Sequence, residues 1–591
     1  RKGRESSVTW CADPGEGRRG TKTGASPPFW GTPLQSVSGR GNSTTNQMMM
    51  ALVLLVLVTA ASSTPLQEEA GGGGGGADFW MRYGDSRLRK SLETEPVVGR
   101  AKNVVVFVGD GMGMATVTAA RIYKGQRAGR SGEEHRLSWE LFPTVGLSKT
   151  YNVDKQVPDS AGTATALFTG VKSKYYMLGL DSRAPFGDCD PRVNERARLA
   201  SIMQWAQDAG KHTGLVTTTR VTHATPAALY AHSNHRDWEC DSEIPFRLRD
   251  CVKDIARQLV EDGPGKHFKV VLGGGQRQFG IPLTAEYDPD DDSCNRTDDL
   301  NLLPEWLRGK RNAVFVNDTG SLRAVDAASV EHLLGLFSPG HMPYALERDQ
   351  GPQGSPSLLD MTAKALQVLS KAESGFVLMV EGGRIDHGHH ANYARMAMHE
   401  TSELDDAVAH VAALTDPRDT LLVVTADHSH AFTINGYPKR GNDILGFANK
   451  SAAEGLYETL TYANGPGFDT HRGDGGNGSL WRRATQEERQ SPRYRHFAPF
   501  YLEDETHGGE DVPVYSRGPS AHLLSGTFEE NYVAHVVGYA ACIGPPSKLC
   551  TARDRVGMLQ GQPIPTASTA SALGPLGLLL VLLSLLLLHA T

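Results

Sequence analysis

The sequence predicts an α/β protein with a doubly wound, mainly parallel sheet that is flanked by helices. Short apolar runs rich in β-branched residues recur along the chain, and helical patterns alternate with them. Such alternation favours a parallel sheet that is covered by helices on both faces. The chain of 591 residues is long enough for one large domain with insertions or for about two to four domains of average size.

Strands and helices are predicted in separate segments. The strand pattern occupies residues 103–110, 213–219, 268–272, 375–380 and 420–425. The helix pattern occupies residues around 200–209, 358–371 and 391–414, and a short aromatic-bearing helix begins at Ala77. Residues from about 436 to 503 are rich in Gly, Asn, Arg and aromatic side chains, which indicates an inserted subdomain before the core resumes at Asp511.

The N-terminal part carries features of targeting rather than of a folded domain. Residues 1–47 contain no methionine and are basic and Gly/Ser-rich, so we expect an upstream, non-native leader. Residues 48–62 have the apolar core and small-residue end of a signal peptide, although the basic residue usual at its start is missing. Residues 63–76 include a run of glycines and predict a flexible segment.

The C-terminal part is expected to carry a lipid-attachment signal. Residues 551–572 form a linker that ends in small polar residues, and residues 573–591 form an apolar tail rich in Leu. This order is typical of a glycosylphosphatidylinositol (GPI) signal, whose tail is removed on anchoring. The alternative is a short membrane anchor, but the apolar run is shorter than the roughly 20 residues of a spanning helix.

Cysteine content and charge narrow the protein class. Cys11 lies in the leader, and the sequence alone fixes no pairing among the other six of the seven cysteines. Secretion would permit disulfides, and Cys542 and Cys550 could close a local loop. Sequons that fit a secretory product begin at Asn295, Asn317, Asn449 and Asn477. The net charge of −7 gives no electrostatic case for binding nucleic acid.

Asp and His side chains gather where predicted strands end. The side chains that follow these strands are Asp110, then Glu381, Asp386 and His390, and then Asp427 and His428; His507 follows later, near the end of the core. One such cluster alone could be a helix cap or a solvated loop. Several clusters at the carboxyl ends of strands, where open α/β sheets bind ligands, instead indicate metal binding. Mixed His and carboxylate ligands suit Zn²⁺, and an all-oxygen set built on Glu381 suits Mg²⁺.

Ser160 stands between Asp159 and a run of small residues that can open a helix. It has two interpretations, either a helix N-cap or a nucleophile at the positive end of the helix. Coordination to Zn²⁺ would activate its hydroxyl at neutral pH. The surrounding residues lack the Gly-x-Ser-x-Gly elbow of a hydrolase triad, and Gly109, Gly111 and Gly113 lack the spacing of a dinucleotide site.

At these residues the chain resembles the alkaline phosphatase family. The matching segments follow the family's order: Gly109–Gly113, Val157–Ala166, Thr217–Pro226, Glu381–His390, Thr425–His430 and Glu505–Asp511. The resemblance covers about residues 78–550 and implies a catalytic domain over residues 77–550. It implies a phosphomonoesterase of broad specificity that acts through a phosphoserine at Ser160. The signal peptide and the tail resemble those of animal, secreted, GPI-anchored members at the extracellular face of the cell membrane.

Carried over residue by residue, the resemblance implies two Zn²⁺ and one Mg²⁺ per subunit. The ligands of the first zinc would be Asp386, His390 and His507, and those of the second would be Asp110, Asp427 and His428, beside Ser160. The Mg²⁺ ligands would be Asp110, Glu381 and Thr225, which replaces the family's usual serine but keeps a hydroxyl. Arg236 would bind the phosphate, and the residues near the metals would include His223, His387 and His430.

The resemblance also extends to peripheral features. Glu286 and the Phe337 carbonyl match a calcium site, but Ser338 and Ser355 stand where acidic residues are expected, so tight Ca²⁺ binding is doubtful. The pairs Cys189–Cys251 and Cys542–Cys550 match family disulfides, whereas Cys240 and Cys294 are additional and their pairing stays open. The inserted subdomain resembles the family's crown, and the helix at Ala77 its N-terminal arm. Both imply a homodimer in which Tyr437 is a candidate to reach the neighbouring site.

Two other functions are alternatives to this one. A related metal-dependent phosphodiesterase or sulfatase is one alternative, but the segment after Ser160 lacks the C/S-x-P-x-R setting of a sulfatase nucleophile. A non-catalytic cell-surface binding protein on the same fold is the other. Such a protein is expected to have lost ligands, whereas every expected zinc ligand is present in the sequence.

Overall fold

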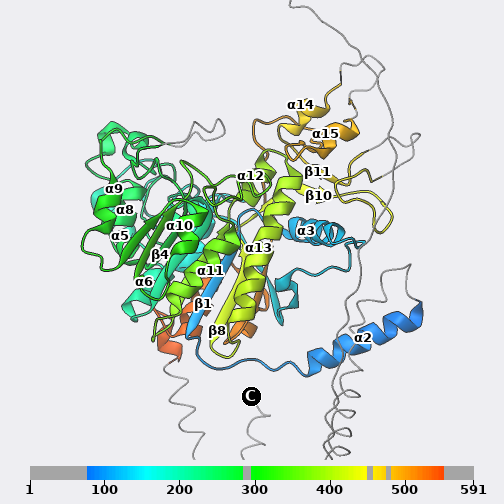
Figure 1. Cartoon of the computed structure of the whole chain (residues 1–591), viewed down its shortest axis with the longest axis horizontal. Coiled ribbons are helices and arrows are strands. Elements are labelled where there is room, and N and C mark those ends of the chain that lie inside the picture. Colours follow the sequence, from blue (N-terminus) through cyan, green and yellow to red (C-terminus); the bar gives the residue numbers. More distant parts are fainter. Residues whose placement is uncertain (1–75, 284–293, 449–456, 474–480, 483, 551–591) are drawn as a thin grey trace, which may run out of the picture. The chain divides into compact units, whose positions relative to one another are not determined.

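The structure, a computed structural model, describes residues 76–283, 294–448, 457–473, 481–482 and 484–550 (Figure 1). The expected leader, signal peptide, Gly-rich segment (apart from residue 76), linker and apolar tail lie outside this part of the chain. So do Glu286 and the sequons at Asn449 and Asn477. Among the residues that are described, no helix combines the length and the apolar character that crossing a membrane requires.

A ten-stranded sheet forms the centre of the fold, in the order β14-β2-β13-β8-β1-β7-β3-β4-β6-β5. Its strands are β1 (Asn103–Gly109), β2 (Thr144–Lys149), β3 (His212–Arg220), β4 (Val270–Gly274), β5 (Ala313–Val316), β6 (His332–Leu336), β7 (Phe376–Gly382), β8 (Thr420–Ala426), β13 (Val512–Arg517) and β14 (Gly526–Glu529). β13 runs antiparallel to both of its neighbours, and the other neighbouring strands run parallel. The predicted mainly parallel α/β sheet is confirmed.

The strands that the sequence predicts are the central ones. β1, β3, β4, β7 and β8 are buried along nearly their whole length. Strands buried on both faces appear in a sequence as continuous apolar runs, which makes them easy to recognise. β2, β5, β6 and β14 are short or half-exposed, and β14 has no buried residue. The sequence pattern therefore did not reveal them.

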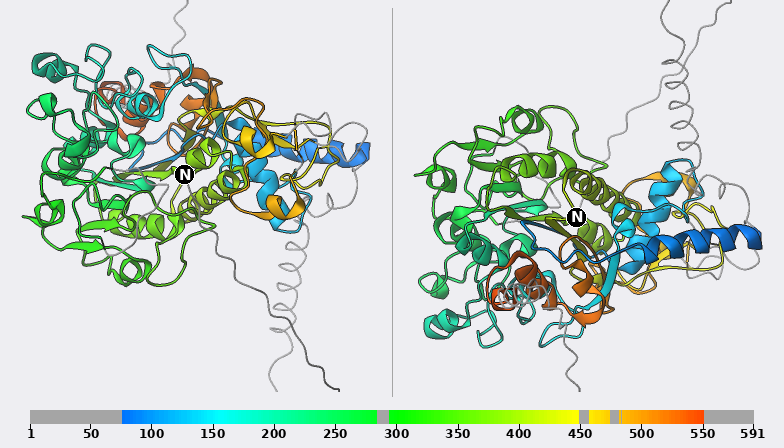
Figure 2. Two further views of the ribbon diagram at one scale, coloured as in Figure 1. Left: turned by 90° about the horizontal axis from the view of Figure 1, so that it is seen from above. Right: turned by 90° about the horizontal axis from the view of Figure 1, so that it is seen from below.

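The described residues form fifteen α-helices, some of which cover the two faces of the sheet. They are α2 (Ala77–Leu92), α3 (Met114–Arg127), α4 (Ser160–Thr169), α5 (Pro191–Ala197), α6 (Ile202–Asp208), α7 (Ala224–Ala227), α8 (Ile255–Glu261), α9 (Leu302–Leu307), α10 (Thr319–Ala324), α11 (Leu358–Leu369), α12 (Arg384–His390), α13 (Ala394–Leu414), α14 (Gly467–His471), α15 (Gln486–Gln490) and α16 (Tyr532–Ala541). Buried side chains of α3, α11 and α13 pack on one face, and those of α4, α6, α8 and α16 on the other. The right-hand view of Figure 2 shows the yellow-green α11 and α13 opposite the orange α16.

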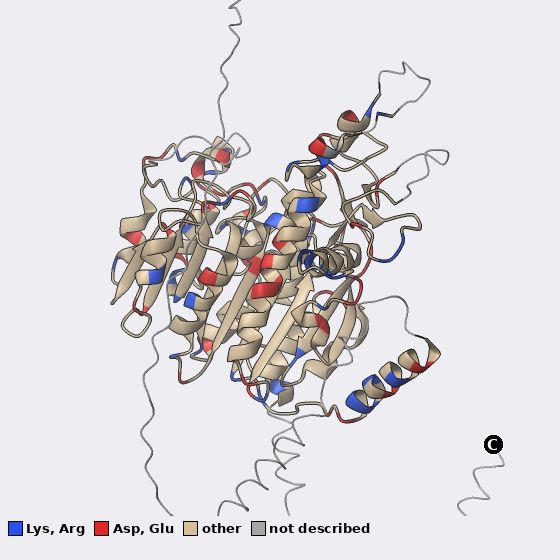
Figure 3. Cartoon of the chain, turned by 45° about the vertical axis from the view of Figure 1, so that its right-hand side comes forward, with Lys and Arg blue, Asp and Glu red and all other residues tan. Residues whose placement is uncertain are grey.

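Two helices differ sharply in burial. All ten residues of α4 are buried, and apart from Leu167 and Phe168 they are small. α2 has no buried residue and carries charged side chains along its length (Figure 3). The helix predicted to begin at Ala77 is therefore present, and it is longer than the short helix expected. Its role as an N-terminal arm stays a prediction.

Two small antiparallel sheets lie beside the main one. β10 (Phe432–Ile434) pairs with β11 (Leu460–Tyr462), and β9 (Ser429–His430) pairs with β12 (His507–Gly508). The described part of the inserted segment, residues 436–503, contains β11, α14 and α15. Its likeness to a crown subdomain stays a prediction.

The six cysteines outside the leader form three disulfides. Cys189 pairs with Cys251 and Cys542 with Cys550, as the family resemblance implied, and the pair left open, Cys240 with Cys294, is also joined. At the doubtful calcium position the Ser355 hydroxyl donates to the Phe337 carbonyl, with 3.0 Å between the oxygens. A neutral donor therefore contacts the carbonyl that was expected to bind the cation.

Candidate active site

Four neighbouring strands bring the predicted site residues to one edge of the sheet. β8, β1, β7 and β3 lie side by side in the parallel part of the sheet. Asp427 follows β8, Asp110 follows β1, Glu381 lies near the end of β7, and His223 follows β3. Because the carboxyl ends of parallel strands meet at the same edge, residues far apart in sequence become neighbours there.

The first cluster consists of Asp386, His390, His430 and His507, whose ligand atoms lie within 4.8 Å of one another. α12 places Asp386 and His390 four residues apart on one face. The β9–β12 pair places His430 opposite His507. The Oδ1 atom of Asp386 lies 2.7 Å from Nε2 of His430 and 3.4 Å from Nε2 of His507. His389, also in α12, is not a member of this cluster: its ring nitrogens face Thr116 and Tyr462, and its ring packs against that of His430 with 4.7 Å between the centroids.

The second cluster surrounds Ser160, the first residue of α4. The Ser160 Oγ lies 3.1 Å from Nε2 of His428 and 3.3 Å from Oδ1 of Asp110. Nε2 of His428 also lies 3.2 Å from Oδ2 of Asp427. The N-cap of α4 is Asp159, whose carboxylate accepts from the first backbone N–H groups of the helix. The structure therefore assigns the cap to Asp159 and leaves the Ser160 hydroxyl facing the cluster.

Gly111 allows the backbone to approach both clusters closely. Its φ of +69° lies in the left-handed region, and an added Cβ would lie 2.3 Å from Nε2 of His430. Its N–H donates to Oδ1 of Asp427 at 3.0 Å. A larger residue at this position would press against His430 and the backbone of Asp386.

A third group adjoins Asp110. Ligand atoms of Asp110, His223 and Glu381 lie within 4.8 Å of one another, and Thr225 lies in α7 next to His223. Four buried atoms here make no hydrogen bond within the described part of the chain: Oδ2 of Asp110, Oε1 of Glu381, Oγ1 of Thr225 and Nδ1 of His223. Buried polar atoms are normally satisfied, so this set fits a bound cation.

The charge at this edge is strongly negative. Burial, followed by the carboxylates of Asp427, Asp386 and Glu381, raises the pKa of Asp110 well above its usual range. Burial also raises the pKa of Asp427, and it raises the pKa of Glu381 to about 7. Burial acts in the same direction on Asp386, but His390 and His430 outweigh it and lower the pKa of that carboxyl. Carboxylates buried this close together are stabilised by cations, so the site can bind metal ions.

The clusters open into a cavity of about 1030 Å³, and Ser160 and Arg236 line it. Nη1 of Arg236 lies 3.2 Å from Oδ2 of Asp159, and Nη2 lies 2.9 Å from Nε2 of His223. Burial by itself lowers the pKa of Arg236, but the Asp159 carboxylate together with Tyr176, Asp237 and Asp110 more than offsets it, so the guanidinium stays charged. A fixed cation thus faces the same cavity as the buried serine.

Sequence reasoning missed His341, which lies with His223 and His387 in a group of three imidazoles at the cavity wall. The His341 and His387 ring centroids are 4.3 Å apart. The signal that could have found His341 is its place shortly after β6, but β6 is only five residues long and was not predicted. Tyr437 is fully exposed, and no described residue of the site contacts it.

Most of the sequence is similar to sequences of known proteins. A sequence profile of the family described as alkaline phosphatase matches residues 101–543. The chain belongs to the alkaline phosphatase family. It is 46% identical over 497 residues to alkaline phosphatase 4 of Drosophila melanogaster, covering 79% of this chain and 82% of that protein. It is 44% identical over 512 residues to the tissue-nonspecific alkaline phosphatase of Homo sapiens, covering 85% of this chain and 95% of that protein.

Solved alkaline phosphatase structures share the fold. The enzyme from the Antarctic bacterium TAB5 superposes with a TM-score of 0.52 at 22% identity, over 76% of this chain and 99% of that chain. The enzyme from Thermus thermophilus gives a TM-score of 0.52 at 24% identity, over 76% of this chain and 92% of that chain. Family membership and the metal-binding clusters together identify this alkaline phosphatase as a metal-binding phosphomonoesterase.

Proposed function

We propose that this alkaline phosphatase hydrolyses a broad range of phosphate monoesters through a covalent phosphoserine at Ser160, with two Zn²⁺ and one Mg²⁺ bound. The observation that carries the proposal is the position of the Ser160 Oγ, which lies 3.1 Å from Nε2 of His428 and 3.3 Å from Oδ1 of Asp110. A serine hydroxyl between an imidazole and a carboxylate of a metal-binding cluster is placed for activation as a nucleophile. The cavity is far larger than a phosphate group, which supports broad specificity.

The chemistry of the donor atoms supports zinc at the first cluster. Nε2 of His390 and Nε2 of His507 lie 3.1 Å apart. The Nδ1 atom of each ring faces a backbone carbonyl, that of Glu505 for His390 and that of Pro158 for His507. Each Nδ1 therefore carries the proton, and the two Nε2 lone pairs converge, which is the arrangement of metal-bound imidazoles with carbonyl partners.

The remaining ligand sets follow from the other clusters. We assign the first zinc to Asp386, His390 and His507, the second to Asp110, Asp427 and His428 beside Ser160, and magnesium to Asp110, Thr225 and Glu381. When bound, these ions would stabilise negative charge on the serine oxygen and on the transferred phosphoryl group. His430 would orient Asp386, because Glu505 and Asp386 outweigh the effect of burial and raise the pKa of His430 to about 10.

The residues of the chain then account for both halves of the reaction. Arg236 binds the phosphate oxygens through its planar guanidinium. The Ser160 oxygen loses its proton and attacks phosphorus, and the alcohol leaves as the phosphoserine forms. Water then attacks phosphorus, and the bond between phosphorus and the serine oxygen breaks. The serine oxygen takes up a proton, and inorganic phosphate is released. The N-terminus of α4 faces the anion throughout.

Replacing Ser160 tests this proposal. The Ser160→Ala variant should lose p-nitrophenyl phosphate hydrolysis at alkaline pH by at least about 1000-fold, because no nucleophile remains. Exhaustive chelation of the parent enzyme should abolish activity, and added Zn²⁺ and Mg²⁺ should restore it. Ser402→Ala, which removes a buried hydroxyl from α13, is the matched control and should keep full activity.

Two outcomes would contradict the proposal. Full activity in Ser160→Ala would exclude the phosphoserine, and full activity after metal removal would exclude the metal-dependent route. Mass spectrometry of enzyme quenched in acid during turnover should locate the phosphoryl group on Ser160.

We also propose a GPI-anchored, glycosylated homodimer at the extracellular face of the cell membrane. Apolar side chains exposed on α2, namely Trp80, Met81, Leu88 and Leu92, support a dimer, because a second subunit could cover them. The fully exposed Tyr437 supports contact with a neighbouring site. The composition of residues 551–591 supports the lipid anchor.

A further inference from the structure

The segment that carries Arg236 has no regular secondary structure of its own. Residues 234–240 belong to neither a helix nor a strand. Arg236 itself is held by its backbone N–H, which donates to the Tyr176 carbonyl at 2.9 Å, and by its guanidinium contacts to Asp159 and His223. An irregular segment can hold a side chain at a fixed position only if its neighbours are anchored to the rigid sheet.

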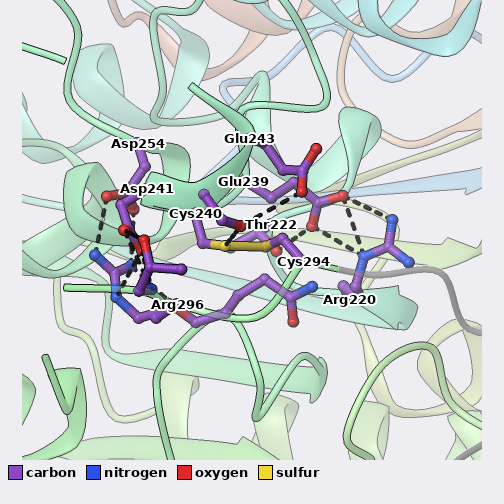
Figure 4. The surroundings of a disulfide bond; sticks show 12 residues. Arg220, Thr222, Glu239, Cys240, Asp241, Glu243, Asp254, Cys294 and Arg296 are labelled. Carbon is purple, nitrogen blue, oxygen red and sulfur yellow. Dashed lines mark hydrogen bonds and ion pairs between the residues drawn. A yellow bond between two sulfur atoms is a disulfide. The ribbon is translucent and has the colours of Figure 1, made fainter. Parts of the chain in front are cut away.

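Glu239, three residues after Arg236, supplies that anchor (Figure 4). Its buried carboxylate accepts from Arg220, at the carboxyl end of β3, with Nε 2.9 Å from Oε2 and Nη2 2.7 Å from Oε1. The Thr222 hydroxyl also donates to Oε2. Two parallel N–H···O bonds between planar groups fix direction as well as distance.

The other side of the segment is anchored as well. The Asp241 carboxylate accepts from the backbone N–H of Thr297 at 3.0 Å, and Arg296 forms an ion pair with Asp254, the N-cap of α8, at 3.1 Å. The Cys240–Cys294 disulfide joins the same two stretches of chain (Figure 4). These contacts tie the segment to α8, whereas Glu239 ties it to Arg220 at the end of β3 and to Thr222 just after that strand.

Arg220 extends the connection to the metal-binding helix. Its backbone N–H donates to Nδ1 of His341 at 3.3 Å. The His341 ring adjoins that of His387, which follows Asp386 in α12. Arg220 therefore contacts both the Arg236 segment and the wall of the cavity on the α12 side.

We infer that Glu239 is a positioning residue, which holds the Arg236 guanidinium at the cavity by binding Arg220. The inference rests on the proposed role of Arg236 in binding phosphate. Replacing Glu239 by Gln would remove the negative charge and turn one acceptor oxygen into an amide donor that faces the donors of Arg220 and Thr222. The segment would then shift, and Arg236 would lose its alignment with the phosphate oxygens.

A double-mutant cycle tests the inference. We compare the parent enzyme, Glu239→Gln, Arg236→Ala and the double variant in the metal-loaded state, using inhibition by inorganic phosphate and kcat/KM for p-nitrophenyl phosphate. Arg236→Ala should raise the phosphate inhibition constant by at least about 10-fold, since a charge-assisted pair is lost. Glu239→Gln should raise it by about 5-fold to 10-fold, and it should add less than about 2-fold in the Arg236→Ala background.

A purely structural role of Glu239 predicts a different pattern. Asp405→Asn on α13, which breaks the partly buried ion pair with Lys124 of α3, is the control for general destabilisation and should leave the phosphate inhibition constant unchanged. Equal effects of Glu239→Gln with and without Arg236, or no effect in either background, would overturn the inference. If Arg236→Ala leaves phosphate inhibition unchanged, the proposed role of Arg236 fails instead. Should Glu239→Gln not fold, Glu239→Asp, which keeps the charge but shortens the reach, is measured in the same cycle with the same two outcomes.

Discussion

Asp386 and Glu400 are buried carboxyl groups on neighbouring helices, and their pKa values move in opposite directions. Burial raises the pKa of both, but His390 and His430 outweigh it at Asp386. At Glu400 only weaker contacts oppose burial, chiefly the Ala345 N–H, so its pKa is raised to about 7. A carboxyl surrounded by cationic partners thus stabilises the fold when ionised, and one without them destabilises it.

Glu400→Gln should make the enzyme more stable at alkaline pH. The carboxyl of Glu400 has its usual pKa of 4.5 when unfolded and about 7 when folded, so the folded state binds more protons between these values and stability falls as pH rises. Removing the charge should raise the free energy of unfolding at pH 8 by up to about 3 kcal/mol, with little change below pH 4.5. Thermal denaturation at both pH values measures the difference.

Glu488→Gln is the control, because the pKa of Glu488 is shifted in the opposite direction to that of Glu400. Its side-chain contact with Arg482 and the Thr485 N–H lower the pKa of Glu488 to about 2, so the ionised form is the stabilising one. That variant should gain no stability at pH 8. An equal gain for Glu400→Gln at both pH values would show that the effect is one of packing rather than of charge.

At the level of single residues, the sequence was sufficient to predict functional residues that lie in short motifs. Asp110, Ser160, Asp386 and His428 could be predicted because each follows a long buried strand or opens a helix of small residues. Glu239 and His341 could not, since their partner Arg220 is distant in sequence and neither lies in a motif with a chemical meaning of its own. Their positions are set by tertiary contacts alone.

At the level of elements, α12 depends on close packing against α13. Gly388 lies between His387 and His389, and an added Cβ would lie 2.9 Å from the backbone nitrogen of Ala397. Backbone atoms of a buried 21-residue helix cannot yield easily, so α12 would have to move. Because α12 carries both Asp386 and His390, its displacement would reach the proposed zinc ligands.

Gly388→Ala should therefore reduce activity and zinc content together. A shift of about 1 Å in catalytic groups costs on the order of 100-fold in rate, so we expect kcat/KM to fall by at least about 10-fold. Metal analysis of the purified variant measures the zinc content. Gly84→Ala, also in a helix but with open space around its Cβ, should keep full activity and gain roughly 0.5 to 1 kcal/mol. Unchanged zinc content in Gly388→Ala would contradict this account.

The elements that the sequence did not reveal share a physical reason. β14 is an edge strand of the sheet and β2 lies next to it, and in both strands exposed residues interrupt the apolar run. The antiparallel β13 between β8 and β2 could be located but not oriented, because strand direction leaves no mark on a strand's own composition. The β9–β12 pair has two residues in each strand, so only the folded chain shows that it places His430 opposite His507.

At the level of the whole molecule, the carboxyl and amino ends of the parallel strands have separate roles. The proposed catalytic residues gather at the carboxyl ends of the parallel strands. At the opposite, amino ends, the N–H of Ala101, which precedes β1, donates to the Ala540 carbonyl near the end of α16 at 2.8 Å. The last described residues thus leave the fold away from the cavity. A lipid attached beyond residue 550 would leave the cavity open to the surrounding fluid.

Phosphatidylinositol-specific phospholipase C should release the enzyme from cells as an active dimer. Because Ala540, near the last described residues, lies at the end of the sheet opposite the cavity, kcat/KM should differ by less than about 2-fold before and after release. Sedimentation of the released protein should give twice the mass of one chain. An enzyme that stays with the membrane fraction would count against the anchor, and a monomeric sedimentation coefficient would count against the dimer.

The complete burial of α4 limits the substitutions that this enzyme can accept as its sequence evolves. A helix with an exposed face can accept new side chains there without disturbing its neighbours, but α4 has no such face. Almost any enlargement along Ser160–Thr169 must push against the sheet, α7 or α16. In a library of random variants, the active ones should carry few substitutions along this stretch. Attempts to alter substrate preference would therefore have to begin from the far wall of the cavity, around Arg384 and Tyr344, and not from the helix that bears the nucleophile.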